Sequence, residues 1–116
     1  MNAGLLVLDD STRYRLLKLL QTNPELSQRQ LAHELGVSLG KINFCMRALL
    51  DKGLVKVRNF RDSNNKLAYA YYLTPKGAEA KVRATAQFLK RKMKEYEEIE
   101  REIEELKREV RAHGIH

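Results

Sequence analysis

Apolar residues recur at helical spacing in three successive segments of the first half of the chain. A residue that can cap a helix precedes each segment: Asp9, Asp10 or Ser11 for the first, Ser27 for the second and Ser38 for the third. A helix stop follows each one, in turn Asn23-Pro24, Gly36 and Lys52-Gly53. The pattern therefore predicts three short helices between residues 10 and 52.

The apolar pattern changes to strand-like spacing after Gly53. The apolar residues of the first short run are Leu54, Val55, Val57 and Phe60. In the second run, Leu67, Tyr69, Tyr71 and Leu73 alternate with Ala68, Ala70 and Tyr72. Residues 61–66 between the two runs are polar and typical of a turn. We expect a β-hairpin whose tip projects into solvent.

One long helix is predicted after the cap Thr74-Pro75, because residues 76–111 contain no further proline and only one glycine near the start. Its apolar residues follow a heptad pattern. One core position holds Val82, Leu89, Tyr96, Ile103 and Val110, and the other holds Ala78, Ile99 and Leu106. Thr85 and Lys92 interrupt the second position, so the apolar seam is best from Tyr96 onward.

The segment from Gln28 to Arg47 has the features of a helix-turn-helix. This motif needs a small residue where its helices cross, a glycine in the turn and apolar residues that face the core. Ala32 and Gly36 supply the first two, and the apolar set is Leu31, Leu35, Val37, Ile42 and Cys45. A generic three-helix bundle is the alternative. We predict a mainly α fold with a small β-hairpin: a winged helix-turn-helix domain over residues 9–74, then a long C-terminal helix over residues 75–112 that forms a coiled coil.

Net charge adds a partner to this picture. The 116 residues carry a formal charge of +7, and residues 1–77 hold 12 basic and 6 acidic side chains. Such a surplus on a small domain suggests a polyanion. One cysteine excludes a disulfide framework, and the apolar stretch Leu5–Leu8 is too short to span a membrane. We expect a cytoplasmic protein that is no enzyme and uses no metal, cofactor or membrane.

The third helix is the predicted reading element, because a helix fits the major groove of DNA. Its outward residues near the start are Ser38, Gly40, Lys41, Asn43, Phe44 and Arg47. Phe44 either contacts a thymine methyl group or sugar, or packs partly within the protein. At the start of the second helix, Ser27, Gln28 and Arg29 are expected near phosphates. In the hairpin, Arg58, Arg61, Asn64, Asn65 and Lys66 suit phosphates or the minor groove.

The run SQRQLAHELGVSLGKINFCMRALLDKGLVKVRNF, followed by KLAYAYYLTPKG, resembles the MarR-type winged-helix regulators. Residues from about Leu8 to Val110 are similar to the small MarR-family regulators associated with exopolysaccharide gene clusters. The resemblance implies a bacterial regulator of transcription that binds double-stranded DNA and acts on polysaccharide biosynthesis genes. Larger members of the family build their dimer from an N-terminal helix and C-terminal helices, whereas this sequence has few residues before Leu5.

The C-terminal helix is the predicted dimer surface, because its own domain is too small to cover it. We assign homodimerisation to Leu89, Tyr96, Ile99, Ile103, Leu106 and Val110. Acidic residues flank this seam, so an antiparallel pair is favoured. It sets the basic cluster of Lys90, Arg91, Lys92 and Lys94 against the acidic run of the second copy. A solvated single helix with internal ion pairs is the alternative.

Two other functions stay open from the residues alone. The first is a protein-interaction adaptor that uses the coiled coil while its winged helix no longer binds DNA. The second is RNA binding, which would favour exposed aromatic side chains such as Tyr69, Tyr71 and Tyr72. Basic residues on both the third helix and the hairpin favour DNA over either alternative.

Overall fold

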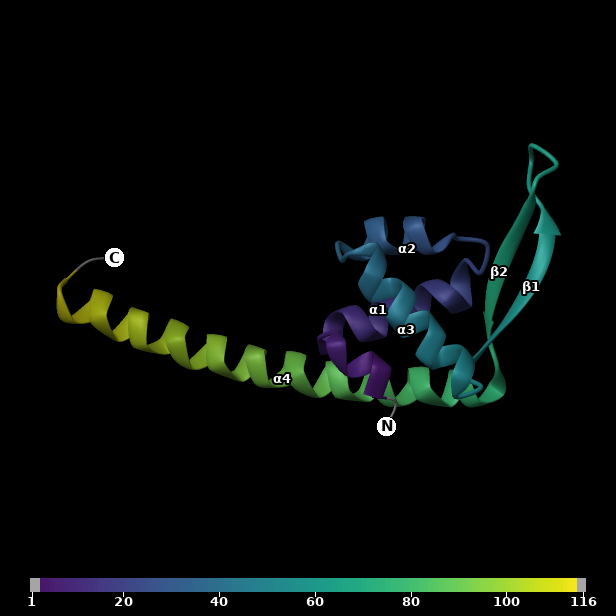
Figure 1. Ribbon diagram of the computed structural model, residues 1–116. Helices are drawn as coiled ribbons and strands as arrows, with labels where there is room; N and C mark the ends of the chain where they lie inside the picture. The colour runs from purple at the N-terminus through teal and green to yellow at the C-terminus, as the bar shows by residue number, and fades with distance from the viewer. Residues whose placement is uncertain (1–2, 115–116) are drawn as a thin grey trace.

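The computed structural model describes residues 3–114, as five helices and one antiparallel hairpin. The elements in chain order are the 3-10 helix η1 (Ala3–Val7), α1 (Asp10–Thr22), α2 (Gln28–Leu35), α3 (Leu39–Asp51), β1 (Val55–Arg61), β2 (Leu67–Leu73) and α4 (Pro75–Ala112). The helices η1 and α1–α3 cluster on the N-terminal half of α4, and the hairpin extends away from them (Figure 1). The predicted mainly α fold, with a winged helix-turn-helix and a long C-terminal helix, is confirmed.

The predicted caps are in place at four helices. In each case, a side-chain oxygen accepts a hydrogen bond from the backbone N–H three residues further on. The four caps are Asp9 (2.8 Å), Ser27 (3.1 Å), Ser38 (3.1 Å) and Thr74 (3.1 Å). Gly36 ends α2 in the left-handed conformation, with φ of 66°, that a glycine adopts without strain. Local sequence signals therefore set these helix boundaries.

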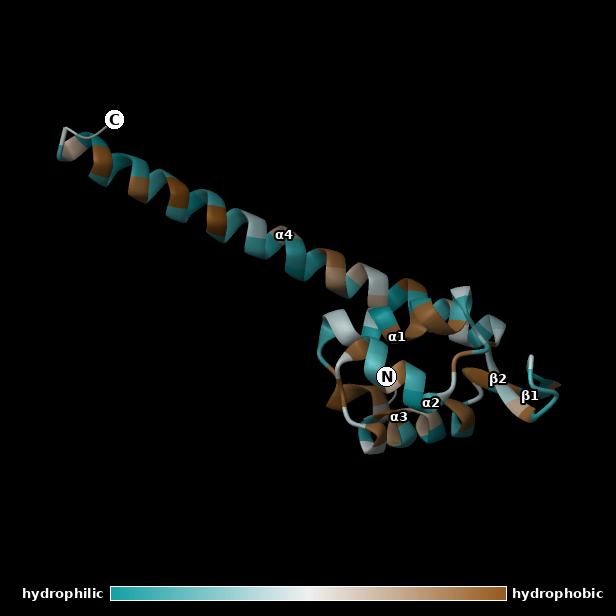
Figure 2. Cartoon of the chain, turned by 90° about the horizontal axis from the view of Figure 1, so that it is seen from above, coloured by the Kyte–Doolittle hydropathy of each residue, from teal (hydrophilic) through white to brown (hydrophobic). Residues whose placement is uncertain are grey.

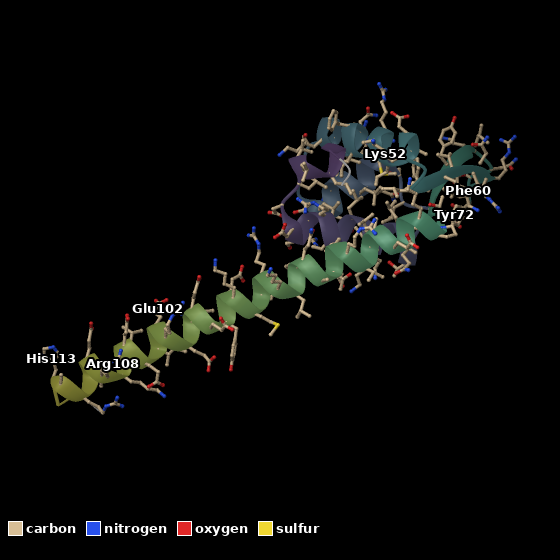
Figure 3. All side chains as sticks on the ribbon, turned by 90° about the horizontal axis from the view of Figure 1, so that it is seen from below. Lys52, Phe60, Tyr72, Glu102, Arg108 and His113 are labelled. Carbon is tan, nitrogen blue, oxygen red and sulfur yellow. The ribbon has the colours of Figure 1, made fainter. Side chains whose placement is uncertain are left out.

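The long helix α4 has two parts with different surroundings. Its 38 residues correspond to about 57 Å at 1.5 Å per residue, and the molecule is 68 Å in its longest dimension. From residue 92 to residue 112 every side chain except that of Glu95 is exposed. Apolar residues form separate bands along this free part (Figure 2), and no other element lies beside Glu102, Arg108 or His113 (Figure 3).

The N-terminal part of α4 is fastened to the helical body. The ring of Phe88 stacks on that of Tyr14 with centroids 5.3 Å apart, and Arg91 forms a 2.8 Å ion pair with Asp10. At Gly77 an added Cβ would overlap the carbonyl oxygen of Leu54. Glycine is therefore required where α4 crosses the base of the hairpin.

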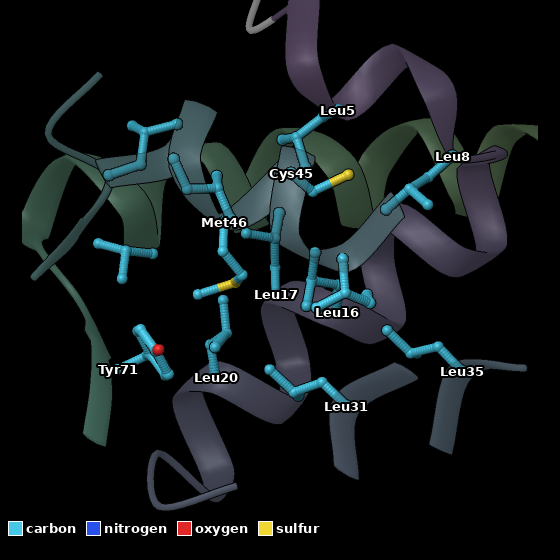
Figure 4. Close-up of a cluster of buried hydrophobic side chains, with 14 of the residues drawn as sticks. Leu5, Leu8, Leu16, Leu17, Leu20, Leu31, Leu35, Cys45, Met46 and Tyr71 are labelled. Atoms are coloured by element: carbon cyan, nitrogen blue, oxygen red, sulfur yellow. The ribbon is translucent and has the colours of Figure 1, made fainter. Parts of the chain in front are cut away.

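The core lies between α1, α2 and α3 (Figure 4). Its fully buried side chains are those of Leu16, Leu17, Leu20, Leu31, Ile42, Cys45, Met46 and Leu49. The sequence pattern predicts no element before Asp9, yet Leu5 and Leu8 are also buried here. Arg13 holds this segment, because its Nε donates to the carbonyl of Leu5 (3.2 Å) and its Nη2 to that of Leu8 (2.9 Å).

Candidate nucleic-acid interface

The outward side of α3 is open to solvent over its first three turns. Lys41, Asn43 and Arg47 are exposed on it, while Ile42 and Met46 on the opposite side are fully buried. The two sides follow from the helical period, because residues three and four apart share one side. The exposed side thus presents two cations and an amide, the groups that pair with phosphates and base edges.

Phe44 lies on the same open side. Its side chain is 56% exposed, so it does not pack within the helical body of its own chain. The structure therefore does not show the packing role for Phe44, and its contact with DNA stays a prediction. An exposed phenylalanine between a lysine and an arginine is suited to contact apolar groups such as a thymine methyl group.

Gly40 has no structural reason to be glycine. An added Cβ would come no closer than 4.0 Å to any neighbour, that of Ser38 Oγ, and its φ is not positive. In a helix, glycine costs about 1 kcal/mol relative to alanine. The absent side chain instead leaves the backbone at the start of α3 open to close approach by a partner.

A hydrogen-bonded chain of side chains ties α3 to α2 and to the hairpin. Asn43 Nδ2 donates to Gln28 Oε1 (3.2 Å), and Gln28 Nε2 donates to the hydroxyl oxygen of Tyr71 (3.2 Å). Tyr71 in turn is fixed through its backbone N–H, which donates to the carbonyl of Pro24 (2.8 Å). Gln28 therefore orients Asn43 in addition to lying near the surface itself. Ser27 and Arg29 beside it are exposed.

The tip of the hairpin is organised by Asp62, a residue that sequence analysis did not assign to the site. Its Oδ1 accepts hydrogen bonds from the backbone N–H groups of Asn64 and Lys66, both at 2.9 Å. Asn65 adopts the left-handed conformation with φ of 59°. Aspartate in a turn that bonds the following N–H groups is a sequence signal that could have identified it. The ordered tip holds Arg61 and Lys66 at the exposed end of the hairpin.

The two hairpin arginines lie on opposite faces. In the antiparallel register Arg61 is opposite Leu67 and shares its face with Tyr71, which is turned toward α2. Arg58 is opposite Ala70 on the other face, where its guanidinium lies 5.9 Å from the centre of the Tyr72 ring. The structure therefore places Arg61 on the face of the hairpin that is turned toward the start of α2. Arg58 lies on the opposite face, away from α2.

The hairpin and the start of α2 enclose a shallow groove, lined among others by Ser27, Gln28, Arg61 and Tyr69. Tyr69 is 52% exposed and is the aromatic residue that this groove offers to a partner. Tyr71 is buried, and Tyr72 is half-buried beneath Arg58. The three tyrosines therefore do not form the continuous aromatic platform that RNA recognition would favour.

Cys45 lies behind the exposed side of α3, in the core. Burial raises the pKa of its thiol, and the positive charge of Lys41 offsets part of that effect. The thiol is therefore neutral near pH 7 and shielded from solvent, which makes it a poor nucleophile. Within residues 3–114 no cluster of histidine, cysteine and acidic side chains could hold a metal ion, and no helix is long and apolar enough to cross a membrane.

The residues assigned to dimerisation form an uncovered stripe on α4. Their exposures are 59% for Leu89, 63% for Tyr96, 54% for Ile99, 44% for Ile103, 54% for Leu106 and 40% for Val110. Met93, which sequence analysis omitted, is 57% exposed between Leu89 and Tyr96 and extends the stripe. Part of the neighbouring basic cluster is engaged within the chain, because Arg91 pairs with Asp10 and Lys92 with Glu95.

Comparisons with known proteins agree with this fold. Residues 9–56 match the family model described as winged helix-turn-helix DNA-binding. The chain is similar to a MarR family transcription regulator of known crystal structure, with 23% identity and a TM-score of 0.54 over 84% of this chain and 63% of that one. It is also similar to the transcriptional regulator MosR of M. tuberculosis, with 20% identity and a TM-score of 0.55 over 96% of this chain and 84% of MosR.

A third similar structure is that of Streptococcus pneumoniae FabT in complex with DNA, with 21% identity and a TM-score of 0.50 over 84% of this chain and 71% of FabT. The chain spans about three fifths of the length of the MarR family regulator named first. No curated protein matches it. The class of protein that the fold defines is therefore the winged helix-turn-helix proteins, with the fold of the MarR-family regulators.

Proposed function

We propose that this protein is a sequence-specific regulator of transcription that binds double-stranded DNA as a homodimer. The observation that carries the proposal is the uncovered start of α3, where Gly40, Lys41 and Arg47 face solvent. A second basic element, the tip of the hairpin, projects from the same body. The match of residues 9–56 to the winged helix-turn-helix model supports it further.

The roles of the residues follow from the chemistry of duplex DNA. Lys41, Asn43 and Arg47 enter the major groove on α3, where arginine and lysine pair with guanine and asparagine with adenine. Ser27, Gln28 and Arg29 approach a phosphate at the start of α2, where free backbone N–H groups add to the attraction. The tip of the hairpin, with Arg61, Asn64, Asn65 and Lys66, contacts the backbone or minor groove, and Arg58 adds charge from the other face.

Replacing the two cations of α3 tests the proposal. The Lys41→Ala/Arg47→Ala variant should bind a duplex, selected from a random pool by the wild-type protein, at least about thirtyfold more weakly, because each such contact is worth about 1–3 kcal/mol. Fluorescence anisotropy at several salt concentrations measures the affinity. The salt dependence should also fall by about one unit of slope for each phosphate that the variant no longer neutralises.

The Arg101→Ala/Arg108→Ala variant is the matched control, because it removes the same charge from exposed positions of α4. It should bind that duplex within about twofold of wild type, because those charges lie outside the proposed DNA surface. Wild-type affinity in the Lys41→Ala/Arg47→Ala variant would exclude this docking of α3.

The exposed stripe of α4 favours a second candidate, a protein-interaction adaptor in which the winged helix does not bind DNA. The two candidates differ in one result. An adaptor would enrich no sequence from a random duplex pool, whereas a regulator enriches one. Basic side chains on both α3 and the hairpin support the regulator.

We also propose that the targets are exopolysaccharide biosynthesis genes. The support is the resemblance of residues 8–110 to the small MarR-type regulators associated with such gene clusters. Nuclease footprinting on the DNA upstream of the protein's own gene cluster tests the assignment. Protection of a site there is expected, and enrichment of unrelated promoters alone in chromatin precipitation would overturn it.

A further inference from the structure

The apolar stripe of α4 is longer than its free part. Val82 is 69% exposed and Leu89 is 59% exposed, although both lie where α4 is packed on the body. The contacts with the body come from the other side of the helix, through Gly77, Ala84, Phe88 and Arg91. The uncovered stripe therefore runs from Val82 to Val110, and its midpoint is close to Tyr96.

Charge is divided sharply along the same helix. Residues 75–94 carry seven basic side chains and one acidic, whereas residues 95–112 carry eight acidic and four basic. The net charges of the two segments are thus +6 and −4. A helix with opposite charges at its two ends attracts a second copy that runs in the opposite direction.

We propose that two copies of this chain pair antiparallel along the whole stripe, with the crossing point level with Lys94. This inference rests on the homodimer proposed above, and it specifies the direction and register of that dimer. The positive segment of each copy then lies along the negative segment of the other. A parallel pair would instead place like-charged segments side by side.

The heptad positions allow this register, because the two core positions face each other in an antiparallel pair. With the centre at residue 94, Val82 faces Leu106 of the second copy, and Leu89 faces Ile99 of the second copy. Tyr96 faces Lys92, whose aliphatic stem covers the ring. Ile103 faces Thr85 of the second copy, and Val110 faces Ala78.

Flanking charges support the same choice. In this register Lys81 lies beside Glu109 of the second copy, Glu79 lies beside Lys107, and the two Met93 side chains meet at the centre. Among the charged residues, only Glu95 faces its own counterpart, and Lys92 pairs with it at 3.2 Å within each chain. Shifting the pair by one heptad toward the C-termini places Glu95 against Glu102 on both sides and loses the Glu79–Lys107 pair. Like charges that face each other in this way are destabilising.

The pairing also sets how far the two DNA-binding bodies are offset along the helix axis. Ala84, which is buried, marks the middle of the packed part of α4. Two copies of Ala84 would lie about 30 Å apart along the helix axis, which is twice ten residues at 1.5 Å each. Each body lies on the side of its helix that faces away from the second copy, so this value is the axial offset of the bodies and not the distance between their recognition helices.

Disulfide trapping tests the direction and the register. Leu89→Cys and Ile99→Cys single variants, one enlarged by a tag, are mixed in a glutathione buffer and separated on a non-reducing gel. We expect the mixed disulfide between positions 89 and 99 to dominate, because only these positions then approach within disulfide range. The wild-type chain, whose Cys45 is buried, is the control and should stay uncrosslinked.

Each other outcome is decisive. Disulfides between like positions would show a parallel dimer, and a dimer in sedimentation without a mixed disulfide would exclude this register. Either result overturns the inference and leaves the proposed homodimer in place. A protein that is monomeric at all concentrations in sedimentation would overturn the proposed homodimer as well. The proposed DNA binding is tested separately, by measuring the affinity of that monomer for the duplex.

A charge exchange gives an independent test. Glu79→Lys and Lys107→Glu should each weaken dimerisation about threefold to tenfold in sedimentation equilibrium, and the double variant should recover most of the loss. The reason is that each single change places like charges together at two points of the dimer. A loss of dimer affinity in the double variant that equals the sum of the two single losses would contradict the pairing.

Discussion

Helix α3 and the free part of α4 have the same amphipathic pattern and opposite surroundings. In α3 the apolar residues Ile42, Met46 and Leu49 are fully buried by other elements of the chain. In α4, Ile103 and Leu106 occupy equivalent apolar positions and are 44% and 54% exposed. A hydrophobic stripe on a helix therefore indicates a surface that is to be covered, but it does not identify what covers it. The exposed polar side of α3 is accordingly the proposed DNA surface, and the exposed apolar side of α4 the proposed dimer surface.

The largest expected effects come from truncating one leucine in each helix. Leu49→Ala should lower the free energy of unfolding by about 2–5 kcal/mol, because it removes a fully buried side chain and leaves a cavity. Leu106→Ala should change the unfolding of the monomer by less than about 0.5 kcal/mol. It should instead raise the dimer dissociation constant at least about tenfold, by analogy with buried anchors of other interfaces.

Urea unfolding at a protein concentration below the dimer dissociation constant separates these two effects, because dimerisation itself stabilises the folded chain. Sedimentation gives the dissociation constant. A large loss of monomer stability in Leu106→Ala would contradict the contrast between the two helices, because it would mean that the chain covers its own stripe.

A smaller effect is expected at the exposed side of α3. Gly40→Ala should raise the free energy of unfolding by up to about 1 kcal/mol, since the new methyl group meets no neighbour and alanine favours the helix. The same change should weaken binding to the selected duplex about tenfold, because the methyl group lies where the backbone approaches DNA. Unchanged DNA affinity in a stabilised variant would show that the start of α3 is not in close contact with DNA.

The smallest effect concerns the cap of α1, which lies in neither of the two helices compared. The pKa of Asp9 is lowered from its usual value, chiefly because its carboxylate accepts a hydrogen bond from the backbone N–H of Thr12. Asp9→Ala should cost about 1 kcal/mol of stability at pH 7. The group binds its proton more weakly when folded, so its contribution is complete above the unfolded pKa and is lost as pH falls through the lowered value. The thermal unfolding temperatures of the wild type and of Asp9→Ala should therefore converge as pH falls below the lowered pKa of Asp9.

Local signals predicted much of the fold. The caps Ser27, Ser38 and Thr74, together with Gly36, have local partners, so helix boundaries could be predicted from neighbouring residues alone. The 3-10 helix was missed because the apolar run Leu5–Leu8 is too short to show a helical repeat. Its buried Leu5 and the following Leu8 are held by Arg13, which comes later in the sequence. Its fastening depends on packing that a short pattern does not reveal.

The candidate site also has features that could be predicted from the sequence and features that could not. Exposed cations on α3 and the hairpin could be predicted from helical and strand periods. The bridge from Asn43 through Gln28 to Tyr71 could not, because these residues are up to 43 positions apart and meet only when α2, α3 and the hairpin pack together. Asp62 was recognisable from turn chemistry, whereas the position of Arg58 on the opposite face depends on the strand register.

The sequence alone determined the order and type of the main elements, the charge division along α4 and the apolar stripe, because each depends on residues that are close in the chain. Only the tertiary structure decided which of two amphipathic helices is covered, and which side of α4 the body occupies. Those outcomes depend on where distant segments meet, as at the ion pair of Arg91 with Asp10 and the close crossing at Gly77. The stripe from Val82 to Val110 stays open because the body occupies the opposite side of the helix.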